Sequence, residues 1–242
     1  MDGIWRETYF YFKGEKTPVL MLHGFPGESY NGTPMEKNHD IAHLIHQQGH
    51  AVYLPHYQGL GQNKSGAFSF TQSYEQSLAL AHKILSNHER LIIVGHSWGG
   101  YVGMALNLAL KDKIQKTILL SPLSYLPPKD VLTGLITTLH SETPRLQATP
   151  APVLAADLFA LDTRIYPDKE SAVKNLVNVV IFHAEIDDEI PLELSLRLVA
   201  TNPAIDLKIC DTDHGFMRNR EQMIKEVPIK EVPAHLSVST AY

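Results

Sequence analysis

The chain has 242 residues, of which 44% are hydrophobic and 19% are charged, and its formal net charge is −5. This composition is ordinary for a soluble protein, and the length suits one large domain or two small ones. The acidic balance and the lack of a basic block argue against nucleic acid or an anionic membrane surface as a partner.

The sequence also restricts the cellular compartment in which we expect the protein. A single cysteine rules out an internal disulfide, which fits a reducing compartment. The first residues lack the basic region and apolar core of a secretory signal. No apolar run approaches the ~18 residues that a membrane helix requires. We therefore expect a cytoplasmic protein with no membrane span.

The first third of the chain alternates between strand and helix patterns. Residues 8–13 are aromatic, which predicts an edge strand, and residues 17–22 form an apolar run that predicts a buried strand. A helix is predicted over residues 39–48, ending at Gly49. Residues 50–55 predict the next strand. Residues 73–87 predict a helix, because their apolar positions recur at helical spacing.

The most informative stretch is LIIVGHSWGGYVG, residues 91–103. Its β-branched start predicts a buried strand, and residues 101–110 predict a helix, with Gly95, Ser97 and Gly99 at the turn between them. A serine at the apex of a strand, a sharp turn and a helix is the context of a nucleophile elbow, G-x-S-x-G. Glycines relieve the crowding at such a turn, and the helix N-terminus favours negative charge at the serine. Ser97 is therefore our candidate nucleophile.

After a strand predicted at residues 116–120, the alternation stops between residues 122 and 170. This segment carries seven of the fifteen prolines and two apolar pieces, residues 130–139 and 153–160, that favour short helices. A segment this long and irregular is either disordered or a functional cap, and its apolar content argues against disorder. We therefore expect residues 1–121 and 171–242 to form the main domain and residues 122–170 to form an inserted lid.

The alternation then resumes to the end of the chain. Residues 178–183 and 206–210 predict strands, and residues 193–200 and 217–227 predict helices. Strands alternating with helices predict an α/β fold, with a mostly parallel sheet covered by helices on both faces. The tail repeats IKEVP at residues 224–228 and 229–233, and we have no functional interpretation of that repeat.

Further polar groups follow predicted strands, at the sheet edge where open α/β folds bind ligands. Asp187, with Asp188 as the alternative, follows residues 178–183, and His214 follows residues 206–210. A serine hydroxyl needs a base to take its proton, and an imidazole base needs a carboxylate to orient it. Ser97, Asp187 and His214 occur in the chain order typical of α/β-hydrolases. We interpret His96, beside the candidate nucleophile, as a packing residue.

An oxyanion formed at Ser97 also needs hydrogen-bond donors. One expected donor is the backbone N–H of Trp98, the residue after the nucleophile. The other is the backbone N–H of Phe25, in the loop after the strand that ends in His-Gly.

The chain resembles the α/β-hydrolases, and more narrowly the small bacterial carboxylesterases and monoacylglycerol-lipase-like esterases. The resemblance rests on YFYFKGEKTPVLMLHGFPG, GHSWGG, a short cap, HAEIDDEIP and DTDHGF, in that order, from Tyr9 to about Val227. The chain departs from many relatives at HYQGLG, where they carry Asp-x-Arg-Gly-x-Gly. The resemblance implies hydrolysis of carboxylic esters through an acyl-enzyme, with no metal and no cofactor.

The substrate is expected to be a small-molecule ester bound between the lid and the elbow. The lid residues that could line this pocket are apolar, which favours a short-to-medium acyl ester or a monoglyceride. The pocket candidates are Leu123, Tyr125, Leu126, Leu158 and Phe159, with Leu132, Leu135, Ile136 and Leu154 as further apolar lid residues.

Three alternatives stay open on sequence alone, and so does the oligomeric state. A thioesterase would use the same three catalytic groups. A proline-type aminopeptidase also uses Ser-Trp elbows, but it needs acids to hold the substrate amine, and the lid offers few. These lid acids include Asp130, Glu142, Asp157 and Asp162. A non-catalytic, ligand-binding member of the fold would keep the same residues.

One pattern is compatible with a zinc site, because His39, His43, His46 and His50 recur at helical spacing. The sequence has no H-E-x-x-H motif, and no acid is obviously placed as a further ligand. We interpret this stripe of histidines as a solvated helix face and expect no metal.

Overall fold

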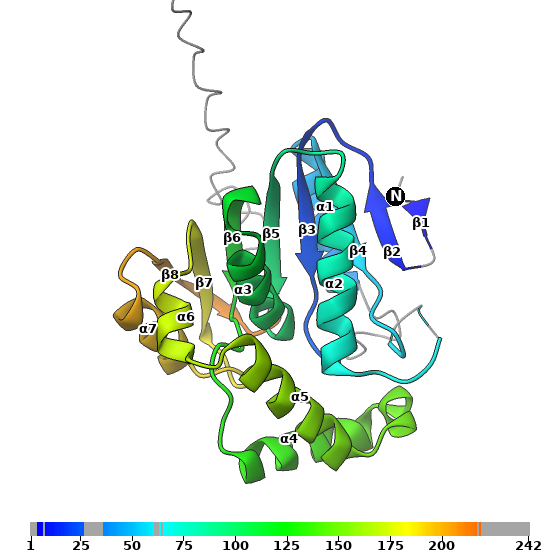
Figure 1. Ribbon diagram of the computed structural model, residues 1–242, viewed down its shortest axis with the longest axis vertical. Helices are drawn as coiled ribbons and strands as arrows, with labels where there is room; N and C mark the ends of the chain where they lie inside the picture. Colours follow the sequence, from blue (N-terminus) through cyan, green and yellow to red (C-terminus); the bar gives the residue numbers. More distant parts are fainter. Residues whose placement is uncertain are drawn as a thin grey trace, which may run out of the picture.

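The computed structural model describes residues 4–6, 8–26, 36–60, 63, 65–216 and 218. Its strands form one eight-stranded sheet in the order β1-β2-β4-β3-β5-β6-β7-β8 (Figure 1). β2 pairs in antiparallel fashion with β1 on one side and with β4 on the other, and the other neighbouring strands are parallel. The strands are β1 (Ile4–Trp5), β2 (Tyr9–Phe12), β3 (Lys16–Leu22), β4 (His50–Pro55), β5 (Leu91–His96), β6 (Ile114–Leu120), β7 (Val179–Ile186) and β8 (Asp206–Asp213).

Helices cover both faces of this sheet, as the sequence pattern predicted. α2 and α3 lie on one face and α1 lies on the other (Figure 1). The helical elements are α1 (Glu36–Gln47), α2 (Phe70–Leu85), α3 (Trp98–Leu110), η1 (Lys111–Lys113), α4 (Lys129–Glu142), η2 (Pro144–Ala148), α5 (Ala151–Ile165), α6 (Lys169–Lys174) and α7 (Leu192–Thr201). The helix predicted at residues 217–227 and the IKEVP repeat lie outside the described residues.

One prediction about the sheet is wrong. We expected residues 8–13 to form an edge strand, but β2 lies between β1 and β4, with Ile4 paired to Tyr11. The edge on this side is β1, which is two residues long. So short a strand leaves no alternation pattern that could be seen in the sequence.

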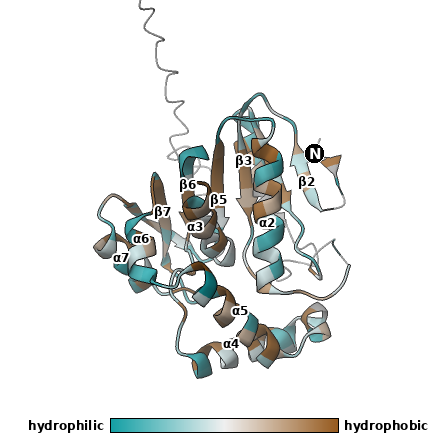
Figure 2. Ribbon diagram, viewed as in Figure 1, coloured by the Kyte–Doolittle hydropathy of each residue, from teal (hydrophilic) through white to brown (hydrophobic). Residues whose placement is uncertain are grey.

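The strand side chains alternate between two apolar clusters, one on each face of the sheet. On β3, Leu20 and Leu22 belong to the cluster that also contains residues of α2, α3 and α5, whereas Val19 and Met21 belong to the cluster that contains α1 residues. This period of two is the pleat of a β-strand. The central strands are accordingly mostly hydrophobic, while α2 mixes hydrophobic and hydrophilic residues along its length (Figure 2).

The segment between β6 and β7 contains α4, η2, α5 and α6, so both helices predicted there are present, and both are longer than expected. α4 packs against α5, and the two lie beyond the carboxyl ends of β3 and β5 (Figure 1). α5 is joined to the start of α2 through Asp157, whose Oδ2 accepts hydrogen bonds from Ser69 Oγ (2.9 Å) and Thr71 N–H (3.2 Å). No helix in the described ranges is both long enough and apolar enough to cross a membrane.

Candidate active site

Ser97 occupies the sharp turn between β5 and α3, with a φ of 54°. Its N–H donates to the carbonyl of Leu120 at 3.0 Å, and its own carbonyl accepts from the N–H groups of Gly100 (2.9 Å) and Leu123 (3.1 Å). A positive φ is unfavourable for a residue with a Cβ, and it persists only where the surroundings hold it. β5, β6 and α3 together hold Ser97 in this strained conformation.

Glycine is required at two positions around this turn. A Cβ at Gly99 would lie 2.2 Å from the carbonyl oxygen of Leu22, and a Cβ at Gly95 would lie 2.3 Å from the carbonyl oxygen of Gly99. The loop after β3 also comes close, because a Cβ at Gly24 would lie 3.2 Å from Ser97 Cβ. Phe25, the next residue, is thereby brought beside the serine turn.

His214 and Asp187 meet at the neighbouring end of the sheet. They follow the adjacent parallel strands β8 and β7, so their loops leave the same edge. His214 Nδ1 lies 2.8 Å from Asp187 Oδ2, and their side chains are only 4% and 1% exposed. A buried hydrogen bond of this kind fixes the tautomer and the orientation of an imidazole.

Asp187 is held on both of its oxygens. Its Oδ1 accepts the backbone N–H groups of Glu189 (3.1 Å) and Ile190 (2.8 Å). Burial alone would raise the pKa of Asp187, but the hydrogen bond and charge of His214 and the hydrogen bonds of Ile190 and Ser121 lower that pKa to about 2. The carboxylate is therefore ionised at neutral pH and can stabilise a charged imidazole. Asp188, the alternative acid, is exposed.

Two further histidines contribute to this site: His96, interpreted from the sequence as a packing residue, and His183, to which the sequence assigns no role. His96 Nε2 lies 2.8 Å from the carbonyl oxygen of His214, and the two rings are 4.7 Å apart. His96 therefore links the end of β5 to the turn that carries His214, so interpreting it as packing alone understates its place. Its position directly before Ser97 was the available signal.

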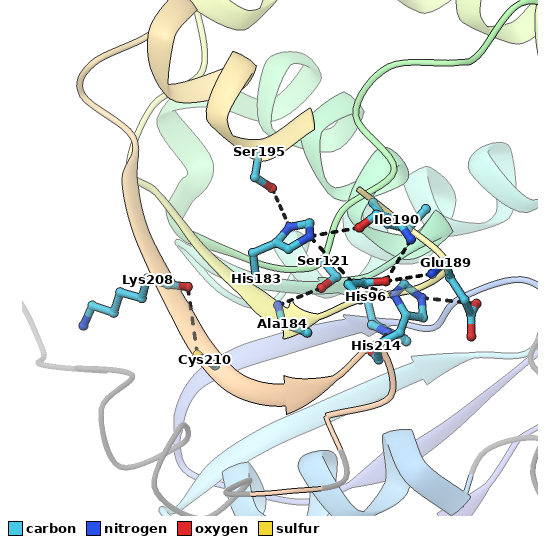
Figure 3. A network of polar contacts seen from close by, with 11 residues as sticks. His96, Ser121, His183, Ala184, Glu189, Ile190, Ser195, Lys208, Cys210 and His214 are labelled. Carbon is cyan, nitrogen blue, oxygen red and sulfur yellow. Dashed lines mark hydrogen bonds and ion pairs between the residues drawn. The ribbon is translucent and has the colours of Figure 1, made fainter. Parts of the chain in front are cut away.

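His183 contacts the turn after β7 through its side chain. Its Nε2–H donates to the carbonyl of Ile190 at 3.0 Å, and its Nδ1 accepts from Ser195 Oγ at 2.8 Å (Figure 3). Nε2 also lies 3.7 Å from Asp187 Oδ2. Burial lowers the pKa of His183, which favours the neutral ring. A histidine inside the apolar run of residues 178–183 was the sequence signal for such a buried role.

The two expected oxyanion donors border the serine, one at the start of a helix and the other in the loop after β3. Trp98 is the first residue of α3, and Phe25 follows the close approach at Gly24. In the part of the chain that the structure describes, no acceptor is hydrogen-bonded to the backbone N–H of either residue. Both groups can therefore donate to an anion.

The lid residues expected to form a pocket pack mostly against the main body. Leu158 and Tyr125 are buried within the apolar cluster that contains Trp98, and Leu123, Leu126 and Phe159 are partly buried against it. Of the further lid residues, Leu132, Ile136 and Leu154 are buried, but Leu135 is 54% exposed. Leu135 therefore lies on the outer face of α4 and does not line an interior surface.

The predicted histidine stripe can be followed at His43, His46 and His50. Within the described residues, no group of three or more His, Cys, Asp or Glu side chains is arranged to hold a metal ion. His43 Nε2 instead lies 3.1 Å from Gln47 Nε2 on the same helix, and His46 Nδ1 lies 3.4 Å from the carbonyl oxygen of His50.

Solved structures with a similar fold include two that are described as lipolytic enzymes. One chain from the metagenome-derived lipolytic enzymes LipS and LipT is 15% identical, with a TM-score of 0.67 over 91% of this chain and 95% of its own. The monoacylglycerol lipase of Paleococcus ferrophilus is 18% identical, with a TM-score of 0.63 over 94% and 97% of the two chains. Est1E from Butyrivibrio proteoclasticus is 16% identical, with a TM-score of 0.62 over 90% of each chain. At these identities the likeness shows a shared fold.

The family comparison is more specific. No curated protein matches the chain in sequence. A family model described as the alpha/beta hydrolase fold, however, matches residues 17–190, which run from β3 to the turn that carries Asp187. Together with the strand order and the strained serine turn, this match shows that the chain belongs to the α/β-hydrolase fold family.

Proposed function

We propose that this protein is a serine hydrolase that cleaves carboxylic esters, with Ser97 as nucleophile, His214 as base and Asp187 as its orienting carboxylate. The observation that carries the proposal is the buried 2.8 Å hydrogen bond between His214 Nδ1 and Asp187 Oδ2. It commits Nδ1 to Asp187. The other ring nitrogen, Nε2, is buried and has no hydrogen-bond partner among the described residues. It is therefore available to accept a proton during the reaction.

The first half of the reaction forms an acyl-enzyme. Nε2 of His214 takes the proton of Ser97 Oγ as that oxygen attacks the ester carbon. The backbone N–H groups of Phe25 and Trp98 donate to the oxyanion of the tetrahedral intermediate. The intermediate collapses when the C–O bond to the alcohol breaks, and His214 gives its proton to the leaving alkoxide.

The second half releases the acid. A water molecule gives a proton to Nε2 of His214 and attacks the acyl carbon, and collapse of the new intermediate returns the proton to Ser97 Oγ. Asp187 stays ionised throughout and stabilises the imidazolium. Its pKa of about 2 supports this role, because the group does not protonate at neutral pH.

We propose that residues 122–170 act as a lid over this site and that the acyl chain packs against its apolar residues. The N–H of Leu123 bonds to the carbonyl of Ser97, so the segment starts beside the nucleophile. Tyr125 and Leu158 belong to the apolar cluster there, and Leu126 and Phe159, which are only partly buried against it, leave apolar surface accessible. Such a surface favours a short-to-medium acyl ester or a monoglyceride over a charged peptide.

The lid acids give no support to an aminopeptidase. Asp157 already accepts hydrogen bonds from Ser69 and Thr71, and Asp162 is paired with Lys169 at 3.1 Å. A carboxylate that is already bonded in this way is a poor receptor for a substrate amine. Esters therefore remain the better-supported substrates.

The direct test is turnover of p-nitrophenyl esters of increasing acyl length, beside matched thioesters and aminoacyl amides. We expect hydrolysis of the esters, with a maximum at short or medium chains, and loss of that hydrolysis in Ser97→Ala while the variant stays folded. Thioesters cleaved well ahead of the esters would make the protein a thioesterase. No turnover of any substrate would favour a ligand-binding protein.

A further inference from the structure

The second nitrogen of His214 faces another carboxylate. Glu189 Oε2 lies 3.5 Å from His214 Nε2, the nitrogen opposite the one bonded to Asp187 (Figure 3). The His214 side chain is 4% exposed, whereas that of Glu189 is 60% exposed. The imidazole therefore lies between two carboxylates, a buried one on Nδ1 and a solvent-accessible one beside Nε2.

The backbone of Glu189 belongs to the turn that presents Asp187. Its N–H donates to Asp187 Oδ1 at 3.1 Å, so the turn that presents the orienting acid also presents the second carboxylate. Among the described residues, no Lys or Arg is paired with Glu189, whereas Glu170 is paired with Arg197 at 2.6 Å and Glu75 with Arg164 at 3.1 Å. The charge of Glu189 is thus available to a bound molecule.

The proton transfer at His214 Nε2 determines which part of a substrate lies near the Glu189 carboxylate. In the proposed reaction, Nε2 delivers its proton to the departing alcohol, so the alcohol oxygen must come within hydrogen-bond distance of that atom. Glu189 lies 3.5 Å from the same atom, so in the proposed reaction its carboxylate would be on the alcohol side of the scissile bond. The acyl chain lies on the other side of the ester carbon and is less affected.

We propose that Glu189 is a specificity-determining residue that selects esters by the charge on their alcohol part, favouring cationic over neutral and neutral over anionic alcohols. A carboxylate at the edge of a buried site attracts a cation and repels an anion, and because the Glu189 side chain is 60% exposed, water and salt partly screen this interaction. This inference rests on the proposed ester hydrolysis and on no other property of the protein.

The test uses two esters that differ in charge but hardly in shape. Choline butyrate carries a quaternary nitrogen where 3,3-dimethylbutyl butyrate carries a quaternary carbon. We expect the ratio of kcat/KM for the cationic over the neutral ester to fall by about threefold to tenfold in Glu189→Gln at low ionic strength. The ratio in the unmodified protein should also fall as salt rises, because the contact is accessible to water.

Two further variants separate charge from structure. Asp188→Asn removes one charge from the neighbouring, exposed position, and its ratio should stay within about twofold of the unmodified protein. Glu189→Lys should invert the preference, so that 3-sulfopropyl butyrate becomes a better substrate than choline butyrate. Thermal unfolding of the Glu189 variants should match that of the unmodified protein, since the side chain is exposed.

The outcomes distinguish this inference from the function on which it rests. If the neutral ester is hydrolysed and the ratio is the same in Glu189→Gln, the charge-selection role is overturned and ester hydrolysis stands. An equal fall of the ratio in Asp188→Asn would also overturn it, because the effect would then belong to the net charge of the loop. If no ester is hydrolysed and Ser97 reacts with no fluorophosphonate, both proposals fail.

Discussion

Two adjacent aspartates in one loop have different surroundings. Asp187 is buried with both oxygens hydrogen-bonded, and Asp188 is exposed. Residue type and spacing favour neither, because both follow the same strand. The difference arises from the turn itself, in which the N–H groups of Glu189 and Ile190 converge on Asp187.

This difference predicts the effect of removing each charge. Asp187→Asn should lower kcat/KM for p-nitrophenyl butyrate by about 10³- to 10⁴-fold, because an amide stabilises neither the imidazolium nor the required tautomer. Asp188→Asn is the matched control and should keep kcat/KM within about twofold. A larger loss in Asp188→Asn than in Asp187→Asn would show that Asp188, and not Asp187, orients the base.

The depressed pKa of Asp187 also predicts an acid-dependent loss of stability. The pKa is about 2 in the folded chain against 3.8 for an unperturbed aspartate, so the unfolded state binds more protons between these values. The stabilisation, about 2 kcal/mol, is complete above pH 3.8 and is lost as the pH falls to about 2. Urea unfolding should show the difference between the unmodified protein and Asp187→Asn shrinking between pH 5 and pH 2. A constant difference would contradict this.

At this scale the sequence predicts residue types better than contacts. Ser97, Asp187 and His214 could be proposed because each follows a strand, and the structure brings Asp187 and His214 together. The bonds of His96 to His214 and of His183 to Ile190 could not be predicted. They depend on loop conformations that arise only once the strands are paired.

The serine turn is the element whose geometry restricts the sequence most. Gly99→Ala should lower the free energy of unfolding by about 2 kcal/mol or more and reduce esterase activity, because the new Cβ would lie 2.2 Å from Leu22 O. Gly134→Ala is the control, since nothing lies within 4 Å of a Cβ at that site in α4, and it should stabilise by about 0.5–1 kcal/mol. Equal effects of both variants on urea unfolding would refute the steric argument.

One group of side chains connects the two ends of the segment between β6 and β7 to α3. We call this group the anchor cluster, and it consists of Tyr101, Tyr125, Asp162, Tyr166 and Lys169. Lys169 Nζ lies 3.1 Å from Asp162 Oδ1 and 3.4 Å from the ring centroid of Tyr166. It also faces the rings of Tyr101 (4.8 Å) and Tyr125 (5.9 Å). Burial lowers the pKa of Lys169 to about 8, against the opposing effect of Asp162.

This buried cation predicts an alkaline gain of stability. The pKa of Lys169 is about 8 when folded and 10.5 when unperturbed, so the unfolded state binds more protons between these values and stability rises with pH there. Relative to Lys169→Met, which does not titrate, the unfolding free energy of the unmodified protein should rise by up to about 3 kcal/mol from pH 7.5 to 10.5. A difference that stays flat or falls would contradict the depressed pKa.

The anchor cluster marks where element-level prediction stops. Helices α4 and α5 follow from their apolar patterns, but Tyr101 and Asp162 are far apart in the sequence and meet only after the segment between β6 and β7 folds back onto α3. Periodicity describes each helix separately. It carries no information on which side chains of distant helices share a contact.

At the scale of the whole molecule, the sheet determines which residues come together in the candidate site. Ser97 follows β5, Asp187 lies just past β7, and His214 follows β8, with β6 between β5 and β7. Parallel strands end at the same edge, so residues far apart in the chain converge there. The alternation of strands and helices made this architecture predictable. The two-residue β1 was not, because its pairing depends on β2 already being in place.

The most direct measurement is fluorophosphonate labelling followed by mapping of the modified residue by mass spectrometry. Such probes react with a serine hydroxyl only when a neighbouring base activates it. We predict a single adduct on Ser97 that is lost in Ser97→Ala and strongly slowed in Asp187→Asn. Absence of any adduct on Ser97 in the folded protein, or full esterase activity in Ser97→Ala, would contradict the account.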